Sequence, residues 1–338
     1  MSRPAGCRRT ILRALTTLEA LARPRILCIV DRAGWAHDRK TDALARALAD
    51  RYEIVKVLQA DATAGDLERA DAVLIYYWLQ IERLPQLRST FERLRERLMV
   101  GVCSHFELSG AWREPALETL ALARAVFANN RLLHEELAAR LSVPLFYTPN
   151  GVDTELFRPS AAPERAPGPL RVGWAGSLAN QGAAHRGVHE VVAPAAALAG
   201  AELRLAVREE RWRTAVEMVD FYRELDVYVC ASDSEGTPNP CLEASACGLP
   251  IVTTAVGNMP EFVRDGENGF LVERRSEDIA ARLARLHDDP ALRARMGAAA
   301  RIAAEAWDWR CQAPRYAPLF DLALRPPGAA PSAVDAAG

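Results

Sequence analysis

Short apolar runs alternate with amphipathic segments along most of the chain. In its first half, strands are predicted by the runs at residues 25–31, 53–58, 72–77, 99–104, 125–128 and 145–148. Residues 38–51 and 131–141 have the pattern of helices between them. A further helix is indicated by apolar side chains at steps of three and four: Leu84, Leu87, Phe91, Leu94 and Leu98. This alternation predicts βαβ units and a mostly parallel sheet.

A proline-rich stretch then interrupts the alternation. Residues 159–169 contain four prolines among small residues, which predicts a stiff, extended linker. A second series follows, with predicted strands at 170–174, 202–207, 226–231, 250–254 and 269–272. Its predicted helices are 187–199, 213–225 and 239–247, and further helical segments extend from 276 to 324.

We therefore predict an α/β protein with two Rossmann-like domains that face each other across a cleft. The first domain spans residues 25–158 and the second spans 170–305, with the linker at 159–169 between them. Parallel sheets bind ligands outside the carboxyl ends of their strands, so the cleft is the expected active site. The Pro/Ala/Gly tail at 326–338 is expected to be disordered.

Composition narrows the class of protein. The 338 residues include 42 basic and 44 acidic side chains, so no overall positive field favours nucleic acid as a partner. The seven cysteines are scattered without a metal-binding or disulfide spacing, which indicates a reducing, cytoplasmic environment. No apolar stretch approaches the roughly 20 residues that cross a bilayer.

The N-terminal extension, residues 1–24, superficially resembles a signal peptide. Arg13 and Glu19 interrupt its apolar run, which argues against that interpretation. Its apolar residues recur at helical spacing and indicate an amphipathic helix with basic residues near its start. Such a helix either packs on the first domain or makes a peripheral contact with the inner face of a membrane.

The segment 226–254 carries the strongest chemical signal. A predicted strand leads into a turn that holds Glu235, and a helix leaves the turn with Glu243 about one helical turn inside it. Backbone N–H groups at Gly236, Thr237 and Asn239 open the helix, and such groups favour anionic and hydroxyl oxygens. Two carboxylates beside these donors suit a polyhydroxy ligand that carries phosphate. The competing interpretation is that Glu235 caps the helix and Glu243 lies on a solvated face.

The stretch Glu235-Gly-Thr-Pro-Asn-Pro-Cys-Leu-Glu243 closely resembles the signature of retaining GT-B glycosyltransferases of family 4. Segments 256–261, 265–272, 149–159 and 172–177 are also similar to that family, and the resemblance covers roughly residues 25–324. It implies a first domain on the acceptor side and a second domain that holds a nucleotide sugar. It also implies that residues 306–325 form a helix that returns to the first domain.

The resemblance assigns roles to individual residues. Glu235 is expected to contact the hydroxyls of the donor sugar and Glu243 those of the ribose. Arg186 stands where the family usually has lysine and is expected to bind the diphosphate; the alternative is a solvated charge at a helix start. Ser177 replaces a second basic residue that many members carry. The expected donor-binding set is Gly34, Asn150, Gly176, Ser177, Arg186, Gly236, Thr237, Pro238, Asn239, Pro240 and Glu243.

In the first domain, His105 matches a family histidine that lies beside the donor sugar, although a lone histidine after a strand is commonly structural. Gly34 is expected to keep the close backbone approach to the phosphates, whereas Trp35 and His37 depart from the family pattern. The implied catalytic set is Glu235, His105 and Arg186. The chemistry of the family retains anomeric configuration and needs no metal, cofactor or protein nucleophile.

Other functions share this donor pocket. A sugar phosphorylase, a nucleotide-sugar epimerase and a non-catalytic nucleotide-sugar-binding subunit are the alternatives, while transfer to nucleic acid has no support from the net charge. The donor base, the donor sugar and the hydroxyl acceptor, whether saccharide, lipid-linked or small molecule, stay open at this point.

Overall fold

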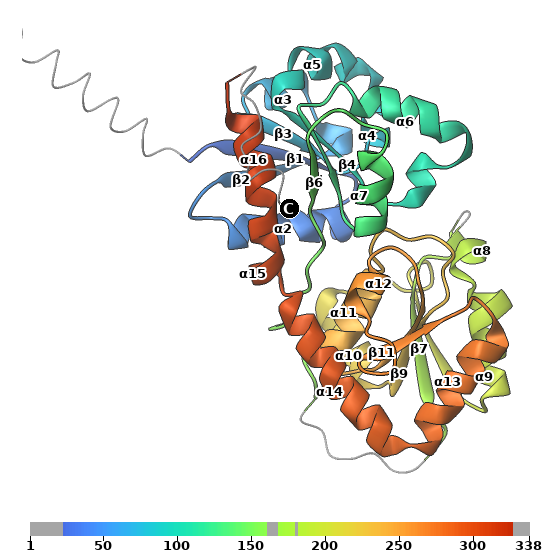
Figure 1. Cartoon of the computed structure of the whole chain (residues 1–338). Coiled ribbons are helices and arrows are strands. Elements are labelled where there is room, and N and C mark those ends of the chain that lie inside the picture. Colours follow the sequence, from blue (N-terminus) through green and yellow to red (C-terminus); the bar gives the residue numbers. More distant parts are fainter. Residues whose placement is uncertain (1–22, 161–167, 180–181, 327–338) are drawn as a thin grey trace, which may run out of the picture.

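The computed structural model describes residues 23–160, 168–179 and 182–326 (Figure 1). It contains two parallel sheets with strand orders β2-β1-β3-β4-β5-β6 and β11-β10-β9-β7-β8. We call the regions built around them the first and the second domain. The predicted α/β class with two Rossmann-like domains is confirmed.

Buried apolar strands form the first sheet, and β3, β4 and β5 are buried along their whole length. All of its neighbouring strands pair in parallel. Its strands are β1 (Arg25–Val30), β2 (Glu53–Leu58), β3 (Ala72–Ile75), β4 (Leu98–Val102), β5 (Ala125–Ala128) and β6 (Leu145–Tyr147). Its helices are α2 (Ala36–Ala47), α3 (Ala64–Glu68), α4 (Leu79–Glu82), α5 (Arg88–Arg93), α6 (Arg113–Leu120) and α7 (Arg131–Ala138).

The second sheet is also parallel throughout. Its strands are β7 (Arg171–Gly176), β8 (Glu202–Val207), β9 (Val227–Cys230), β10 (Ile251–Thr254) and β11 (Gly269–Val272). Its helices are α8 (Gly182–Arg186), α9 (Ala193–Leu198), α10 (Ala215–Arg223), α11 (Asn239–Ala246), α12 (Met259–Phe262), α13 (Ser276–Asp288) and α14 (Pro290–Ala306). A π-helical turn (Val188–Val192) joins α8 to α9.

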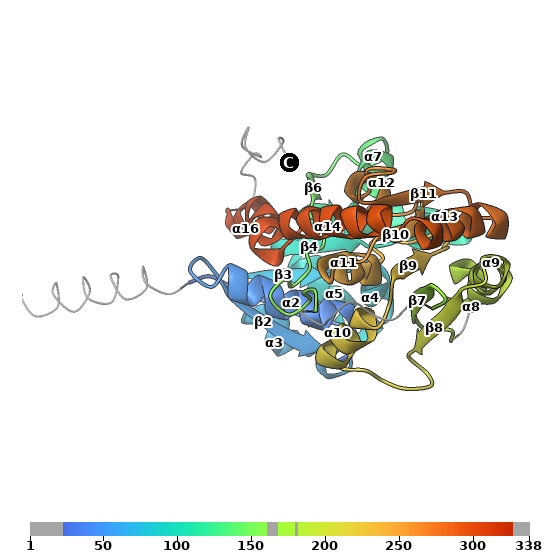
Figure 2. The same cartoon turned by 90° about the horizontal axis from the view of Figure 1, so that it is seen from below.

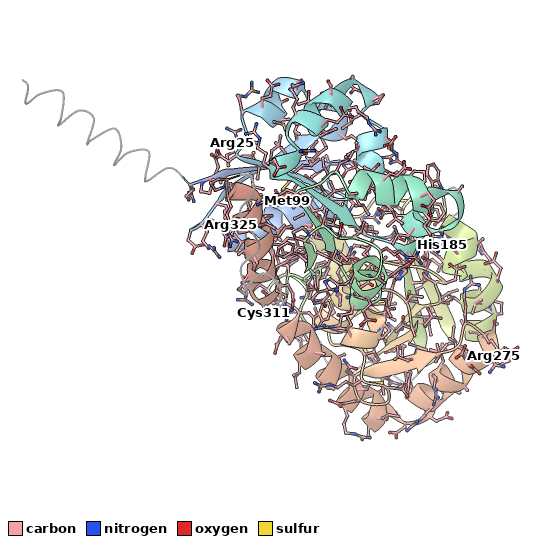
Figure 3. The ribbon with its side chains drawn as sticks, turned by 45° about the horizontal axis from the view of Figure 1, so that its top comes forward. Arg25, Met99, His185, Arg275, Cys311 and Arg325 are labelled. Atoms are coloured by element: carbon pink, nitrogen blue, oxygen red, sulfur yellow. The ribbon has the colours of Figure 1, made fainter. Side chains whose placement is uncertain are left out.

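After α14 the chain returns to the first domain. The 3-10 turn Ala313–Tyr316 and helices α15 (Trp309–Gln312) and α16 (Ala317–Leu324) follow one another there. Tyr316 and Phe320 are fully buried in one apolar core with residues of β1, β3, β4 and β5. Figure 2 shows α16, α14 and α13 in one row across the molecule, and Figure 3 places Arg325 near the first sheet. The final helix is therefore part of the first domain's core.

The continuous helix predicted across Leu84 to Leu98 is wrong. The structure has two 3-10 turns, Pro85–Leu87 and Arg95–Arg97, with α5 between them. All five apolar residues of the pattern are still buried, because short turns keep them against the sheet as a straight helix would. Further 3-10 turns occur at Gln59–Asp61, His105–Leu108 and Gly110–Trp112.

Some expectations concern residues that the structure does not describe. The amphipathic helix predicted for residues 1–24 and the tail at 326–338 lie almost wholly outside the described residues, as does most of the linker at 159–169. Within the described ranges, no helix combines the length and the apolar composition that crossing a bilayer requires.

Candidate functional site

Three adjoining cavities lie between the two domains, and Ala36 and Asn239 line all of them. We name each after one lining residue. The Glu235 cavity measures about 370 Å³ and the Trp35 cavity about 360 Å³, which is within the usual range of ligand pockets, roughly 300–1,000 Å³. The smaller Asp153 cavity is lined by α2 and the segment around Asn150. Figure 3 shows His185, which lines the Glu235 cavity, where the second domain meets the first.

The Glu235 carboxylate is held from two sides. The Ser232 hydroxyl donates to Glu235 Oε1 at 2.9 Å, and Arg186 Nη1 lies 3.1 Å from the same oxygen. Both charged side chains line the Glu235 cavity, although they come from the turn after β9 and from the end of α8. The structure thus brings together the two second-domain residues of the predicted catalytic set.

Three polar atoms near this ion pair lack partners. Among the described residues, Ser234 Oγ, Thr237 Oγ1 and Arg186 Nε are buried without a hydrogen bond. All three residues line the Glu235 cavity. Buried polar groups in folded proteins are nearly always satisfied by protein, water or ligand, so these three atoms are available to hydrogen-bond a polar molecule in the cavity.

At Gly236, the turn that holds Glu235 packs closely against the first domain. A Cβ at this position would lie 1.4 Å from Cys103 O, so only glycine fits. Asn130 Nδ2 donates to Gly236 O at 3.0 Å. Gly257, at φ +53°, approaches the same carbonyl from the other side. The backbone of the turn is therefore fixed relative to the carboxyl end of β4.

Glu243 lies within α11 and is buried. The Tyr222 hydroxyl donates to Oε2 at 2.8 Å, and Arg39 of α2 donates to Oε1 at 3.0 Å. Helix α11 begins after Pro238 without a side-chain cap. These facts rule out the competing interpretation of a capping Glu235 and a solvated Glu243. Pro240 lines the Trp35 cavity together with Glu243, whereas Pro238 serves as the N-cap residue.

A chain of hydrogen bonds crosses the cleft. Lys40 Nζ donates to Asn150 Oδ1 at 2.9 Å, and Asn150 Nδ2 donates to Asn239 Oδ1 at 3.1 Å. All three residues line the Glu235 cavity. Asn150 and Asn239 belong to the predicted donor-binding set, but Lys40 does not.

The Gly34 turn also faces the second domain. Gly34 has φ +74°, and its N–H donates to Asp38 Oδ2 at 2.7 Å. A Cβ on Gly34 would lie 3.1 Å from the Trp212 ring. The Arg208 guanidinium lies 4.1 Å from the centre of the Trp35 ring and 5.6 Å from that of Trp212. This stack forms one wall of the Trp35 cavity.

Ser177 is hydrogen-bonded outside the three cavities. Its hydroxyl donates to Glu209, whose other carboxylate oxygen accepts the Leu178 N–H at 2.9 Å. Gly176 lines the Trp35 cavity, and its missing side chain leaves room for the Trp174 ring and for Arg186. Ser177 lines none of the three cavities described here.

His105 is not placed beside Glu235. It opens the 3-10 turn His105–Leu108, and its Nε2 lies 3.9 Å from Glu136 Oε2 on α7. Its neighbours Ser104 and Phe106 line the Glu235 cavity, but His105 does not. The Ser104 side chain caps this turn, and the turn directs the His105 ring toward α7. The expected place of His105 beside a donor sugar stays a prediction.

His37 is the histidine of the first domain that lines the Glu235 cavity. Its Nδ1 lies 3.2 Å from Asp31 Oδ1, and its ring stacks on Tyr76 with centroids 4.7 Å apart. Burial lowers the pKa of His37 despite the nearby carboxylate, so the ring is neutral near pH 7. The sequence prediction assigned no role to His37.

Lys40 was missed altogether. It stands one helical turn before the fully buried Leu44, at an inward position of α2 where an apolar residue is usual. A lysine at an inward position of a predicted helix can be recognised from the sequence alone. Among the described residues, no group of three or more His, Cys, Asp or Glu side chains is arranged to hold a metal ion.

Part of the second domain matches a known family. The family model described as "Glycosyl transferases group 1" matches residues 211–303. D-inositol 3-phosphate glycosyltransferase of Streptomyces griseus is 41% identical over 108 residues, which are 32% of this chain and 23% of that protein. The enzyme of the same name from Streptomyces bingchenggensis is 38% identical over 113 residues, 33% of this chain and 25% of that protein. The match spans about a quarter of these relatives.

Solved structures share the whole architecture. Sucrose-phosphate synthase from Thermosynechococcus elongatus superposes with a TM-score of 0.70 at 16% identity, over 88% of this chain and 98% of that one. Anabaena HepE in complex with UDP-glucose superposes with a TM-score of 0.69 at 16% identity, over 88% and 99%. The chain therefore has the two-domain fold of GT-B glycosyltransferases, and part of its second domain matches the family described as glycosyl transferases group 1.

Proposed function

We propose that this protein is a glycosyltransferase that moves a sugar from a nucleoside diphosphate to a hydroxyl acceptor. One observation carries the proposal: the Glu235–Arg186 pair and three unpartnered polar atoms surround one cavity between the two domains. A sugar supplies hydroxyl groups for such a wall, and a diphosphate supplies a negative charge for Arg186. The names of the relatives and the bound UDP-glucose of HepE support this choice.

The arrangement suggests how a donor is held. The sugar occupies the Glu235 cavity, where Glu235 accepts hydrogen bonds from its hydroxyls. The nucleoside occupies the Trp35 cavity, where Glu243 accepts from the ribose. Arg186 then leaves Glu235 and binds the diphosphate between the two cavities. A UDP-sugar is the first donor to test, because HepE holds UDP-glucose; a GDP-sugar is the second.

The proposed chemistry is that of a retaining family 4 enzyme. The bond between the anomeric carbon and the diphosphate oxygen breaks, and the acceptor hydroxyl attacks on the same face of the sugar. Its proton passes to the leaving diphosphate, whose growing charge is stabilised by Arg186. Stabilisation of this kind accounts for roughly 100- to 1,000-fold in rate in comparable cases. The proposed mechanism uses no metal ion, cofactor or protein nucleophile.

The acceptor is not carried over from the relatives. Their similarity lies in about a third of this chain, and the family match falls in the second domain, whereas the first domain is the proposed acceptor side. We therefore propose only a hydroxyl acceptor, in glycan, glycolipid or glycosylated-metabolite synthesis. We also propose a cytoplasmic location, which is supported by the six free cysteines of the described part.

A thermal-shift screen tests the proposal directly. UDP, GDP, ADP and their sugars are each added to the full chain, and the melting temperature is followed. We expect one nucleoside diphosphate and its sugar to raise it, and product analysis with and without phosphate to show transfer. Release of sugar phosphate would indicate a phosphorylase, an isomerised nucleotide sugar an epimerase, and binding without products a non-catalytic subunit. If none of the nucleotides binds, the proposed function is wrong.

A further inference from the structure

Lys40 is a buried cation in the wall of the cleft. Its side chain is 3% exposed, and it lines both the Glu235 cavity and the Asp153 cavity. Its ammonium donates to Asn150 Oδ1 at 2.9 Å. It lies 5.2 Å from the ring centres of Tyr76 and Tyr316 and 5.9 Å from that of Phe127. In the part of the chain that the structure describes, Lys40 forms no ion pair with a carboxylate.

A buried cation without an anion is costly. Neutral amide oxygens and aromatic faces compensate only part of the hydration that a lysine loses on burial. Burial lowers the pKa of Lys40 to about 8, which shows how poorly the site without ligand holds the charge. The titratable groups packed around the ammonium are neutral near pH 7: Cys28, His37, Tyr76, Cys103 and Tyr316. Further along the cavities that Lys40 lines, the Glu235 and Glu243 carboxylates are paired with Arg186 and Arg39.

The second domain contributes little positive charge to the Glu235 cavity. Among the described residues, Arg186 is the one arginine or lysine that the second domain contributes to this cavity, and it is paired with Glu235. Ser177 stands where a second basic residue is expected, and it is bound to Glu209. Lys40 lines the same cavity from the first domain. It can therefore provide, from the other side of the cleft, the second positive charge expected at position 177.

We propose that Lys40 binds a phosphoryl group of the ligand, and so supplies from the first domain the positive charge that Ser177 does not provide. This inference rests on the proposed function. The phosphoryl group belongs either to the diphosphate of the donor or to a phosphorylated acceptor, and both would occupy the cleft. The anion compensates the buried ammonium, which in turn lies on the hydrogen-bonded chain through Asn150 to Asn239. Phosphate binding is thereby linked to contact between the domains.

The first test compares ligand affinities by titration calorimetry on the full chain. Lys40→Met keeps the length of the side chain and removes its charge. We expect it to weaken UDP binding by about 10- to 100-fold, the usual contribution of a charged hydrogen bond, and to leave uridine binding unchanged. Lys40→Met/Ser177→Arg should recover part of the UDP affinity. Arg51→Met, which removes an exposed cation paired with Asp321, is the matched control and should bind UDP normally.

A second pair of ligands separates the two sources of phosphate. If D-inositol 3-phosphate loses affinity in Lys40→Met while UDP does not, the phosphoryl group is that of the acceptor. Equal UDP and inositol phosphate affinities in Lys40→Met and the unaltered protein would overturn the inference and leave the proposed function intact. If the unaltered protein binds no nucleotide and no inositol phosphate, both are overturned. A purely structural Lys40 would instead lower the melting temperature without ligand and leave the UDP-induced shift unchanged.

Lysine labelling provides a test without any variant. The chain contains two lysines, Lys40 and Lys56, and Lys56 is an internal reference on β2, outside the Glu235 cavity. An amine-reactive reagent is applied with and without UDP, and the modified peptides are quantified by mass spectrometry. UDP is expected to lower Lys40 modification several-fold relative to Lys56, and uridine is expected not to. Equal modification under UDP and uridine would contradict a contact with phosphate.

Discussion

At the scale of single residues, the proposed donor site requires the Glu235–Arg186 pair to separate when a donor binds. The two groups are 3.1 Å apart, and their side chains are 12% and 27% exposed. Separation is tolerable only if the ligand replaces both partners, with hydroxyls for the carboxylate and phosphate for the guanidinium. The proposed site would therefore favour ligands that carry both groups on one molecule.

This exchange predicts that both partners are needed for sugar transfer. Glu235→Gln keeps the shape of the side chain and removes the charge that orients sugar hydroxyls and Arg186, while Arg186→Met removes the cation for the diphosphate. We expect each to lower kcat/KM with the UDP-sugar by roughly 100- to 1,000-fold. The exposed Glu155→Gln is the control and should behave like the unaltered protein. Sugar transfer that is undiminished in both site variants would remove Glu235 and Arg186 from the mechanism.

The pKa of Lys40 predicts a pH dependence of ligand binding. Lys40 titrates at about 8 without ligand, and only its protonated form attracts phosphate. UDP affinity should therefore be highest near pH 7, where Lys40 is protonated and the terminal phosphate of UDP, with a pKa of about 6, is ionised. It should fall above pH 8 by up to about tenfold per unit of pH. Calorimetry in buffers of different ionisation enthalpy should detect proton uptake on binding near pH 8. In Lys40→Met both effects should disappear; if they persist, another group is responsible.

The positions of the site residues were predictable from the sequence to different degrees. Arg186 was placed by the family resemblance, whereas Glu235 and Glu243 could be placed from the sequence because a strand, a turn and a helix fix their positions locally. His105 could not, because the direction of its ring depends on a 3-10 turn and on Glu136 in another helix. Lys40 was detectable in principle as a charge at an inward helical position. Its role depends on Asn150 and three aromatic rings that are distant in the sequence.

At the scale of elements, the turn between β9 and α11 is confined by backbone on both sides. Gly236→Ala would place a methyl group 1.4 Å from Cys103 O, where no rotamer can relieve the clash. The domains must then move apart, so we expect donor binding to weaken at least tenfold. UDP titration and sugar transfer measure this effect. Gly168→Ala is the control, because nothing lies within 4 Å of its added Cβ and its φ is ordinary; normal binding by Gly236→Ala would contradict the close contact.

The 3-10 turn His105–Leu108 contains a buried carboxyl group with a shifted pKa. Glu107 Oε1 accepts the Cys103 N–H at 2.9 Å, Oε2 has no partner in the described structure, and burial raises the pKa to about 8. A raised folded-state pKa favours the folded protein at low pH, and this contribution is lost as pH rises from about 4.5 to 8.

Glu107→Gln should therefore stabilise the protein at pH 8 by a few kcal/mol relative to the unaltered chain, and this gain should shrink toward pH 5. Glutamine keeps an acceptor for the Cys103 N–H and cannot ionise. Melting temperatures of both proteins across pH 5 to 9 check the prediction. A difference that does not change with pH would show that folding does not raise the pKa of Glu107.

The elements themselves were largely predictable because their patterns are local. Each predicted strand corresponds to an observed one within a few residues, since the apolar runs end where polar turns begin. The helix predicted across Leu84 to Leu98 failed because periodicity records which side chains are buried and not whether the backbone is continuous. Short helices such as α3 and α12 have four or five residues, too few to show a period.

At the scale of the whole molecule, the relative position of the domains depends on contacts far apart in the sequence. Glu261 of α12 accepts the Arg131 N–H at the start of α7 at 2.6 Å, and it also accepts the Tyr147 hydroxyl. The Arg131 side chain adds a cation 3.8 Å from its carboxylate. No local pattern could have predicted this junction, because Glu261 is 130 residues from Arg131 and 114 residues from Tyr147 in the sequence.

The junction predicts a measurable change in shape. Glu261→Ala removes two hydrogen bonds to one carboxylate, each of about 1.5–3 kcal/mol, and leaves the first N–H of α7 without its partner. The arrangement described here should then be less populated, and small-angle scattering should give a larger radius of gyration for the protein without ligand. Glu267→Ala is the control, since Glu267 is exposed and its ion pair with Arg264 lies within its own domain. Because a bound donor contacts both walls of the cleft, UDP-glucose should restore most of the lost compaction, at lower apparent affinity. An unchanged radius of gyration in Glu261→Ala would mean that Gly236 and the helices after α14 hold the domains together without this contact.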